Sequence, residues 1–288
     1  MIVLGFDTAT PSTVVGLRLA DGSVVQARDD PTGERRPGHA TRLLSLASGL
    51  LVEAGVGWDE LERIAVGVGP GTFTGLRIGI ATARGLAQSL GVTLVGVSSL
   101  RALAYGVSDR TANDGGGADG APRADDDAGA DGTPRADDDA GADGAPRADD
   151  DAGADGTPRA DDDAGVLSVI DARRGEVFVA AYDGDVELIA PRALPPTEVG
   201  ELLKRAAART SVERWIAVGD GAVRYRDALQ RPGVVVPEDH SSLHRIDARA
   251  ICELGTRPPA RTPGGDTPVV PDYRRRPDAE IALERVAS

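Results

Sequence analysis

The same order of secondary-structure elements is predicted twice along this chain, once on each side of a repetitive acidic segment. Each half is predicted to contain three strands followed by helix, strand, helix, strand and helix. The first strand of each half ends at an aspartate, Asp7 or Asp171, and the second and third strands meet at an Asp-Gly hairpin signal. A duplicated βββαβαβα unit predicts an α/β protein of two similar lobes, each with a mixed sheet.

The hydrophobic pattern sets the expected bounds of these elements. In the first half we expect strands at 2–6, 13–19, 23–28, 63–68 and 93–97, and helices at 39–54, 75–90 and 98–105. In the second half we expect strands at 166–170, 176–182, 185–190, 215–218 and 234–236, and helices at 197–208, up to 230 and at 241–254. Apolar residues cover more than one face of the helix at 39–54, so we expect it to be buried on two sides.

The charge of the chain is concentrated in one segment. Residues 117–164 are four copies of a twelve-residue unit, GADG(A/T)PRADDDA, and each copy carries −3, so this tract carries −12 of the formal net charge of −14. The unit has no large apolar residue, and we predict that it is a disordered insertion whose deletion leaves folding and binding intact. The near-neutral remainder has no electrostatic footprint for nucleic acid. The expected domains are therefore an N-terminal lobe at 1–110, the acidic repeats at 111–165, a C-terminal lobe at 166–256 and a Pro- and Arg-rich tail at 257–288.

Composition also indicates the compartment. The opening MIVLGFDT lacks the basic region of a signal peptide, and no stretch approaches 18 apolar residues. The single cysteine, Cys252, suits a reducing compartment, and we expect it to be a small buried helix residue. We therefore predict a soluble, cytoplasmic protein with no membrane contact. Because only nine residues are aromatic, the core should consist mainly of Val, Leu, Ile and Ala.

A glycine-rich turn joins a buried strand to a helix at 66–79, with the sequence VGVGPGTFTGLRIG. A Walker phosphate loop is excluded because no lysine follows the glycines; Lys204 is the only lysine in the chain. In the following helix, Gly75, Gly79, Ala83 and Ala87 recur every four residues and would allow another element to approach closely. Three interpretations remain open for this stretch: a tight structural turn, an anion site at the helix N-terminus, or a partner-binding helix.

Further motifs accompany this turn. Together they are GPGTFTGLRIG at 69–79, IVLGFDTAT at 2–10, VSSLRALA at 97–104, DARRGEVF at 171–178 and GDG at 219–221. These motifs resemble the bacterial TsaB (YeaZ) family, whose members form a non-catalytic subunit of the machinery that makes threonylcarbamoyladenosine in tRNA. The tail sequence PDYRR at 271–275 is similar to the family's PxYLR, with Arg in place of Leu. The acidic repeats depart from the family pattern but lie between the motifs.

This resemblance implies a fold and a role. The fold is that of the actin, sugar-kinase and Hsp70 superfamily, with two ribonuclease-H-like lobes. The implied role is a scaffold that binds and stabilises a catalytic TsaD-type paralogue, which transfers threonylcarbamoyl to adenosine 37 of tRNA. A TsaE-type ATPase completes the set, tRNA is contacted only through the complex, and the isolated chain is expected to form homodimers. No catalytic residue is expected in this chain.

We expect the first-lobe helices at 39–54 and 75–90 to form a four-helix bundle with the same pair of the partner. The expected contact residues are His39, Leu43, Leu46, Leu50, Gly75, Arg77, Ile78, Gly79, Thr82, Ala83 and Leu86. An alternative is that these faces pack only against the protein's own sheet.

Two enzymatic alternatives have weaker support in the sequence. An ATP-binding or ATP-hydrolysing enzyme of this fold would use the segment with Asp7, Thr8 and Thr10, a degenerate phosphate hairpin because it lacks glycine. We therefore expect no tightly bound cofactor, and a nucleotide only at the joint between subunits. A metallopeptidase-like protein would use His240 and His244, an HxxxH spacing that would place both on one face of the last helix. We expect no metal site, because no third ligand accompanies this pair and the first half has only His39.

Overall fold

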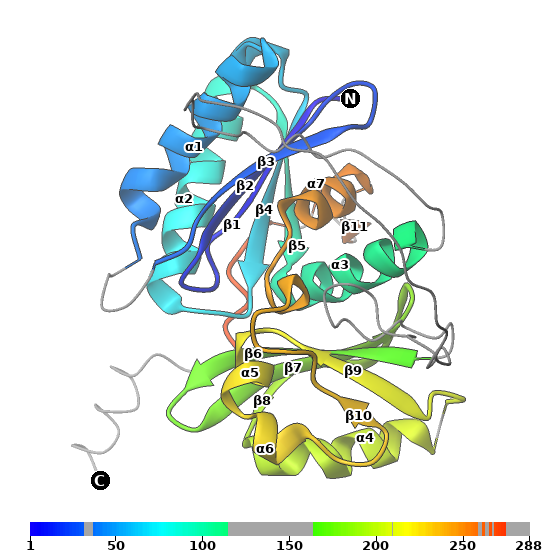
Figure 1. Cartoon of the computed structure of the whole chain (residues 1–288). Helices are drawn as coiled ribbons and strands as arrows, with labels where there is room; N and C mark the ends of the chain where they lie inside the picture. The colour runs from blue at the N-terminus through cyan, green and yellow to red at the C-terminus, as the bar shows by residue number, and fades with distance from the viewer. Residues whose placement is uncertain are drawn as a thin grey trace, which may run out of the picture.

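The computed structural model describes residues 1–31, 37–114, 164–208, 210–258, 261–262, 265–266 and 268–274. Two α/β lobes lie one above the other, and each is built on a five-stranded mixed sheet (Figure 1). The predicted acidic tract lies outside the described residues, apart from its last residue, Ala164. Within the described part, no helix has the length and apolar character needed to cross a membrane.

The first lobe contains the strands β1 (Val3–Asp7), β2 (Thr13–Arg18), β3 (Val24–Asp29), β4 (Arg63–Gly69) and β5 (Thr93–Ser98). Their order across the sheet is β3-β2-β1-β4-β5, with β2 antiparallel to β1 and to β3, and β4 parallel to β1 and to β5. The helices α1 (His39–Ala54) and α2 (Phe73–Leu90) lie side by side on one face of this sheet (Figure 1). The short η1 (Trp58–Glu60) precedes β4, and α3 (Ser99–Asp114) follows β5.

The second lobe repeats this topology. Its sheet contains β6 (Ala164–Arg173), β7 (Glu176–Asp183), β8 (Val186–Leu194), β9 (Arg214–Val218) and β10 (Val234–Val235), in the order β10-β9-β6-β7-β8. The helical elements are η2 (Pro196–Glu198), α4 (Val199–Ala207), α5 (Asp220–Arg224), α6 (Arg226–Leu229), η3 (Ser242–His244) and α7 (Ala248–Thr256). A short pair, β11 (Arg261–Thr262) and β12 (Gly265–Asp266), follows. In both lobes the first strand of the half is central and its two hairpin partners lie on one side, which confirms the duplicated unit.

Several predicted helices differ from those observed. The helix predicted up to 230 is two short helices, α5 and α6, and the helix predicted at 75–90 begins at Phe73. The helix predicted at 241–254 is two elements, because the side chains of Ser241 and Asp247 cap η3 and α7 separately. The helix predicted to start at Thr197 begins at Val199, after the 3₁₀ turn η2. The helix predicted at 98–105 continues to Asp114.

The prediction that α1 is buried on two sides is wrong. One side packs on the sheet through residues such as Leu43 and Leu50, whereas Leu44 is 47% exposed and Val52 is 79% exposed on the other. Apolar residues on both faces of a helix predicted full burial, but here one of these faces is open in the chain by itself.

A continuous hydrophobic core joins the two lobes. It includes Val3 and Ala65 from the first sheet, Leu100 from α3, Ile170 from the second sheet and Ile251 from α7. Two further cores lie within the lobes, one under α1 and α2 and one around α4. As expected from the composition, all three consist mainly of Val, Leu, Ile and Ala.

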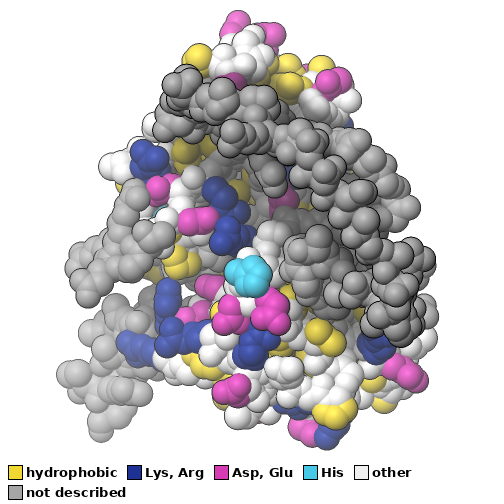
Figure 2. Space-filling model, viewed as in Figure 1, with side chains coloured by type: hydrophobic (Ala, Val, Ile, Leu, Met, Phe, Trp, Pro, Cys, Tyr) yellow, Lys and Arg dark blue, Asp and Glu magenta, His cyan; other side chains and the backbone are white. Residues whose placement is uncertain are grey.

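Charged side chains add further contacts between the lobes. Arg101 of α3 donates a hydrogen bond to the carbonyl of Gly184 in the β7–β8 turn (2.6 Å) and pairs with Asp185, which also accepts from Arg257 (3.0 Å). Arg245, just after η3, lies 3.8 Å from the carboxylate of Asp30. Figure 2 shows arginine and acidic side chains intermixed where the lobes meet on the face in view, rather than a patch of one sign.

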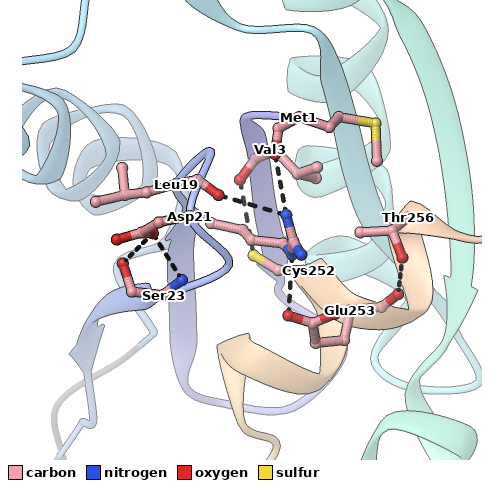
Figure 3. A network of polar contacts seen from close by, with 9 residues as sticks. Met1, Val3, Leu19, Asp21, Ser23, Cys252, Glu253 and Thr256 are labelled. Atoms are coloured by element: carbon pink, nitrogen blue, oxygen red, sulfur yellow. Dashed lines mark hydrogen bonds and ion pairs between the residues drawn. The ribbon is translucent and has the colours of Figure 1, made fainter.

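The last helix, α7, lies on the first lobe, although its sequence follows the second. It packs on the face of the first sheet opposite α1 and α2, against β1 and β2 (Figure 1). Cys252 is fully buried there, as expected, and its Sγ would lie only 2.7 Å from a Cβ added at Gly5. Glu253 accepts a hydrogen bond from Arg18 of β2 (3.0 Å), within the polar network drawn in Figure 3. The segment 166–256 therefore does not pack as one unit.

Candidate docking surface

The glycine turn between β4 and α2 packs against the segment that follows β1. The N–H of Thr72 donates to the carbonyl of Ala9 (2.7 Å), and the Thr8 hydroxyl donates to the carbonyl of Gly75 (2.7 Å). Gly69 has φ +97°, a conformation that favours glycine, and the Gly69–Pro70 peptide is cis. Hydrogen bonds donated in both directions therefore hold this strand-to-helix turn to the segment that follows β1.

The stripe of small residues on α2 faces inward. A Cβ added at Gly75 would lie 2.0 Å from the Thr8 carbonyl oxygen, and one added at Gly79 would lie 2.3 Å from Oγ1 of Thr8. Ala83 is fully buried and Ala87 is 7% exposed. The close approach that the stripe permits is therefore to the protein's own first strand and not to a partner.

This placement corrects the expected contact residues. His39, Leu43, Leu50, Gly75, Gly79 and Ala83 are buried in the first lobe, because α1 and α2 use these positions to pack on the sheet. A partner could not reach these residues without disrupting this packing. Of the remaining expected residues, Leu46, Ile78, Thr82 and Leu86 are half-buried and Arg77 is exposed.

The outward sides of the two helices form a different surface, which we call the uncharged helix face. It comprises Thr41, Leu44, Ser45, Ser48, Gly49 and Val52 of α1 together with Ile78, Ala81, Thr82, Gly85 and Ser89 of α2; all are exposed except the half-buried Ile78 and Thr82. None of these residues is charged. A Cβ added at Gly49 or Gly85 would meet no atom within 4 Å. Of this surface, prediction from sequence included only Ile78 and Thr82, although Ala81, Gly85 and Ser89 also recur every four residues.

The aspartate at the end of β1 points into its own lobe. Asp7 Oδ1 accepts the N–H of Ala9 (2.7 Å), and Oδ2 accepts the hydroxyl of Ser99 (2.6 Å). Burial raises the pKa of the Asp7 carboxyl above its usual value. A Cβ at Gly67 would lie 1.8 Å from Oδ2, so glycine is required on the neighbouring strand. Asp7 therefore caps its own turn, and the degenerate phosphate hairpin lies against the start of α2.

The second lobe has the corresponding arrangement at Asp171. Its Oδ1 accepts the N–H of Arg173 (2.9 Å), and its Oδ2 lies 3.2 Å from the Arg173 guanidinium and 3.5 Å from that of Arg224. Asp220, in the GDG turn, accepts the N–H of Asp171 (3.0 Å). Burial, together with the Asp171 charge, raises the pKa of Asp220. Both first-strand aspartates thus anchor the hairpin turn that follows them.

The two histidines considered as metal ligands do not share a helix face. His240 is exposed in a turn, whereas His244 is buried in η3. The Nδ1 of His244 accepts the N–H of Gly219 (3.2 Å), its Nε2 donates to the carbonyl of Pro237 (3.1 Å), and burial lowers its pKa. Among the residues that the structure describes, no group of three His, Cys, Asp or Glu side chains is arranged to hold a metal ion.

The remaining histidine, His39, is also structural. Its Nδ1 lies 2.8 Å from the Thr13 hydroxyl, and burial lowers its pKa. Neutral imidazole is thus the favoured state of this side chain at the start of α1. His39 ties the first turn of α1 to β2 and lies beneath the uncharged helix face.

The comparisons with known proteins match both TsaD-type and TsaB-type sequences. The family model for TsaD, tRNA N6-adenosine threonylcarbamoyltransferase, matches residues 34–114. The Escherichia coli tRNA threonylcarbamoyladenosine biosynthesis protein TsaB is 27% identical, over 82% of this chain and 78% of that protein. An uncharacterized Mycobacterium leprae protein is 37% identical over 69% of this chain but only 40% of its own length. The solved structure of YeaZ from Pseudomonas aeruginosa matches over 89% of this chain and 91% of its own, with 25% identity and a TM-score of 0.58.

The duplicated sheets, with an aspartate at or near the end of each first strand, define a two-lobed α/β protein. The sequence and structural matches narrow this class further. They support the TsaB (YeaZ) family for this chain.

Proposed function

We propose that this chain takes part in the biosynthesis of threonylcarbamoyladenosine in tRNA as a cytoplasmic scaffold subunit. In this role it binds and stabilises a catalytic TsaD-type paralogue, which transfers threonylcarbamoyl to adenosine 37. A TsaE-type ATPase joins the same complex, and tRNA is contacted through the complex. The family membership supports the pathway, and the uncharged helix face supports the role of a binding subunit.

The uncharged helix face is the observation that carries this proposal. Exposed helix faces of soluble proteins ordinarily carry charged residues, and an apolar or small-residue face indicates a contact with another molecule. Leu44 and Val52 supply exposed apolar area, while Gly49 and Gly85 leave room for helices to approach closely. Arg42 and Glu53 lie near the two ends of α1, so the exposed middle of the helix carries no charge that docking would bury.

The match to the transferase family model supports a paralogue as the partner. It spans residues 34–114, which include both α1 and α2. A protein of that family is therefore expected to carry a related helix pair, and the two pairs would form a four-helix contact through their outward sides. The contact is still a four-helix bundle, but its residues lie on the uncharged helix face and not on the buried stripe.

A matched pair of valines tests this proposal. Val52 of α1 is 79% exposed on the uncharged helix face, and Val186 of β8 is 60% exposed on the second lobe. We expect Val52→Arg to weaken binding of the paralogue by about tenfold or more, because the guanidinium would be desolvated without a partner. Val186→Arg should bind like the wild type. Affinity would be measured by calorimetry, with thermal unfolding to verify that both variants fold.

Equal affinity of the Val52→Arg variant and the wild type would contradict docking through this face. The same variant also reports on self-association. We propose that the isolated chain forms a homodimer through the same surface, so sedimentation should show Val52→Arg shifted to monomer and Val186→Arg unchanged. A dimer that persists in Val52→Arg would assign self-association to another surface.

We also propose that the chain is non-catalytic and binds no cofactor tightly by itself, with any nucleotide held at the joint between subunits. Support comes from Asp7, whose two carboxylate oxygens are both engaged inside the lobe by Ala9 and Ser99. An ATP-hydrolysing enzyme of the same fold is the competing function. Hydrolysis of ATP by the purified chain, abolished by Asp7→Asn, would favour that enzyme over the scaffold.

A further inference from the structure

A segment near the carboxyl end of the chain lies beside α2 on the first lobe. The N–H of Asp272 donates to the carbonyl of Val68 near the end of β4 (2.8 Å). Arg84 of α2 donates to the carbonyl of Val269 (2.6 Å). The methyl groups of Val269 also approach Gly96 of β5, where an added Cβ would meet them at 3.4 Å. Residues 268–274 thus contact α2 and the ends of two strands at once.

Aromatic and cationic groups add to this contact at the first turn of α2. The rings of Phe73 and Tyr273 lie 5.2 Å apart between centroids, with an interplanar angle of 31°. The Arg77 guanidinium lies 3.7 Å from the centre of the Phe73 ring, and its Nε donates to the Tyr273 hydroxyl (3.1 Å). These three side chains form one stacked cluster, an arrangement that stabilises partly exposed surfaces.

The start of α2 has no side-chain cap. Its N-cap residue, Thr72, makes no side-chain hydrogen bond to the free N–H groups of the first turn. A helix end without a cap frays more readily. The contacts that the structure shows at this end come from Thr8 and Ala9 on one side and from Tyr273 on the other.

We infer that residues 268–274 form an intramolecular strap that holds the amino-terminal half of α2 on the first lobe. Arg77 and Arg84 lie on one side of α2 and bind the strap, whereas Ala81 and Gly85 lie on the uncharged helix face. Arg77, expected from sequence to contact a partner, is therefore assigned to the strap. By holding α2 in place, the strap also keeps the uncharged helix face in the conformation that binds the paralogue. This consequence rests on the proposed function.

Hydrogen exchange of α2 tests the strap without any partner. We expect Tyr273→Ala to raise amide exchange over residues 76–84 by about threefold or more, because the stacked cluster is lost. Tyr273→Phe, which keeps the ring, should raise it less. Val270→Ala is the matched control, since Val270 is 53% exposed in the same segment, and it should exchange like the wild type.

A chain truncated after residue 267 should show the same loss of protection, and a synthetic peptide of residues 268–274 added to it should restore protection. Unchanged exchange in Tyr273→Ala would overturn the inference, and this point variant decides the matter if the truncated chain does not fold.

Paralogue affinity separates the two proposals. If α2 loses protection in Tyr273→Ala and affinity falls by about tenfold, both the strap and its effect on docking are supported. If protection falls but affinity does not change, the effect on docking is overturned. If the wild-type chain does not bind the paralogue at all, the proposed function fails while the exchange data still decide on the strap.

Discussion

Two glycines on α2 show how differently one residue type is used within a single helix. Gly79 faces the first strand, where a Cβ would lie 2.3 Å from the Thr8 hydroxyl oxygen. Gly85 faces outward, where a Cβ would meet nothing within 4 Å. The first glycine is required by packing inside the lobe. Gly85 lowers the stability of the helix and makes no close contact within the chain, as expected of a position that contacts a partner.

These positions give a matched prediction for stability. Gly79→Ala should lower the free energy of unfolding by about 1–3 kcal/mol, because its methyl group overlaps Thr8. Gly85→Ala should raise it by about 0.5–1 kcal/mol, because alanine favours the helix and has space. Urea unfolding of the two variants beside the wild type measures both changes. A tolerated Gly79→Ala would show that the strand and helix are not packed as closely as described.

At the scale of elements, α7 shows that sequence order and spatial place differ. It follows the strands of the second lobe, yet it covers the sheet of the first through Ile251 and Cys252. Its approach to β1 and β2 requires Gly5 and Gly16, since a Cβ at either would crowd Cys252 or Ala248. The helix therefore joins the end of the second half to the core of the first.

The reactivity of the Cys252 thiol tests how firmly α7 packs on the first sheet. Burial raises the pKa of Cys252 to about 12, so at pH 8 its thiol should be both protonated and out of reach. We expect an aromatic disulfide reagent to leave the native protein unlabelled and to label one thiol per chain in denaturant. Rapid labelling of the native protein would show that α7 leaves the sheet readily.

At the scale of the whole molecule, the two lobes share one core. Val3 and Ala65 of the first sheet belong to the same buried cluster as Ile170 and Val218 of the second, with α3 and α7 between them. The buried hydroxyl of Ser168 donates to the carbonyl of Leu100, which adds a polar tie (2.7 Å). Loss of either lobe would expose this shared surface to water.

We therefore expect the lobes to unfold together. The two tryptophans lie one in each lobe, Trp58 in η1 of the first and Trp215 in β9 of the second. In the Trp58→Phe variant, Trp215 reports on the second lobe. In the Trp215→Phe variant, Trp58 reports on the first lobe. Their fluorescence transitions in urea should each coincide with the circular-dichroism transition of the same variant. Separate fluorescence and circular-dichroism midpoints within either variant would show that the shared core does not couple the lobes.

Much of the fold could be predicted from local patterns. The alternation of apolar residues and the Asp-Gly hairpins placed the strands, and α1 was predicted with its observed bounds. The candidate site was predicted only in part. The pair of helices was expected, but the small-residue stripe chosen as the contact surface is buried, because a four-residue repeat does not say whether the facing element belongs to the same chain.

The sequence by itself determined the duplicated architecture and the resemblance to the TsaB (YeaZ) family, since both depend on local order and on motifs such as the run at 69–79. Only the tertiary structure decided which side of α1 and α2 is open, that α7 covers the first sheet, and that residues 268–274 return to α2. Each of these depends on contacts between segments far apart in the chain, and such contacts leave no periodic trace in the residues that make them.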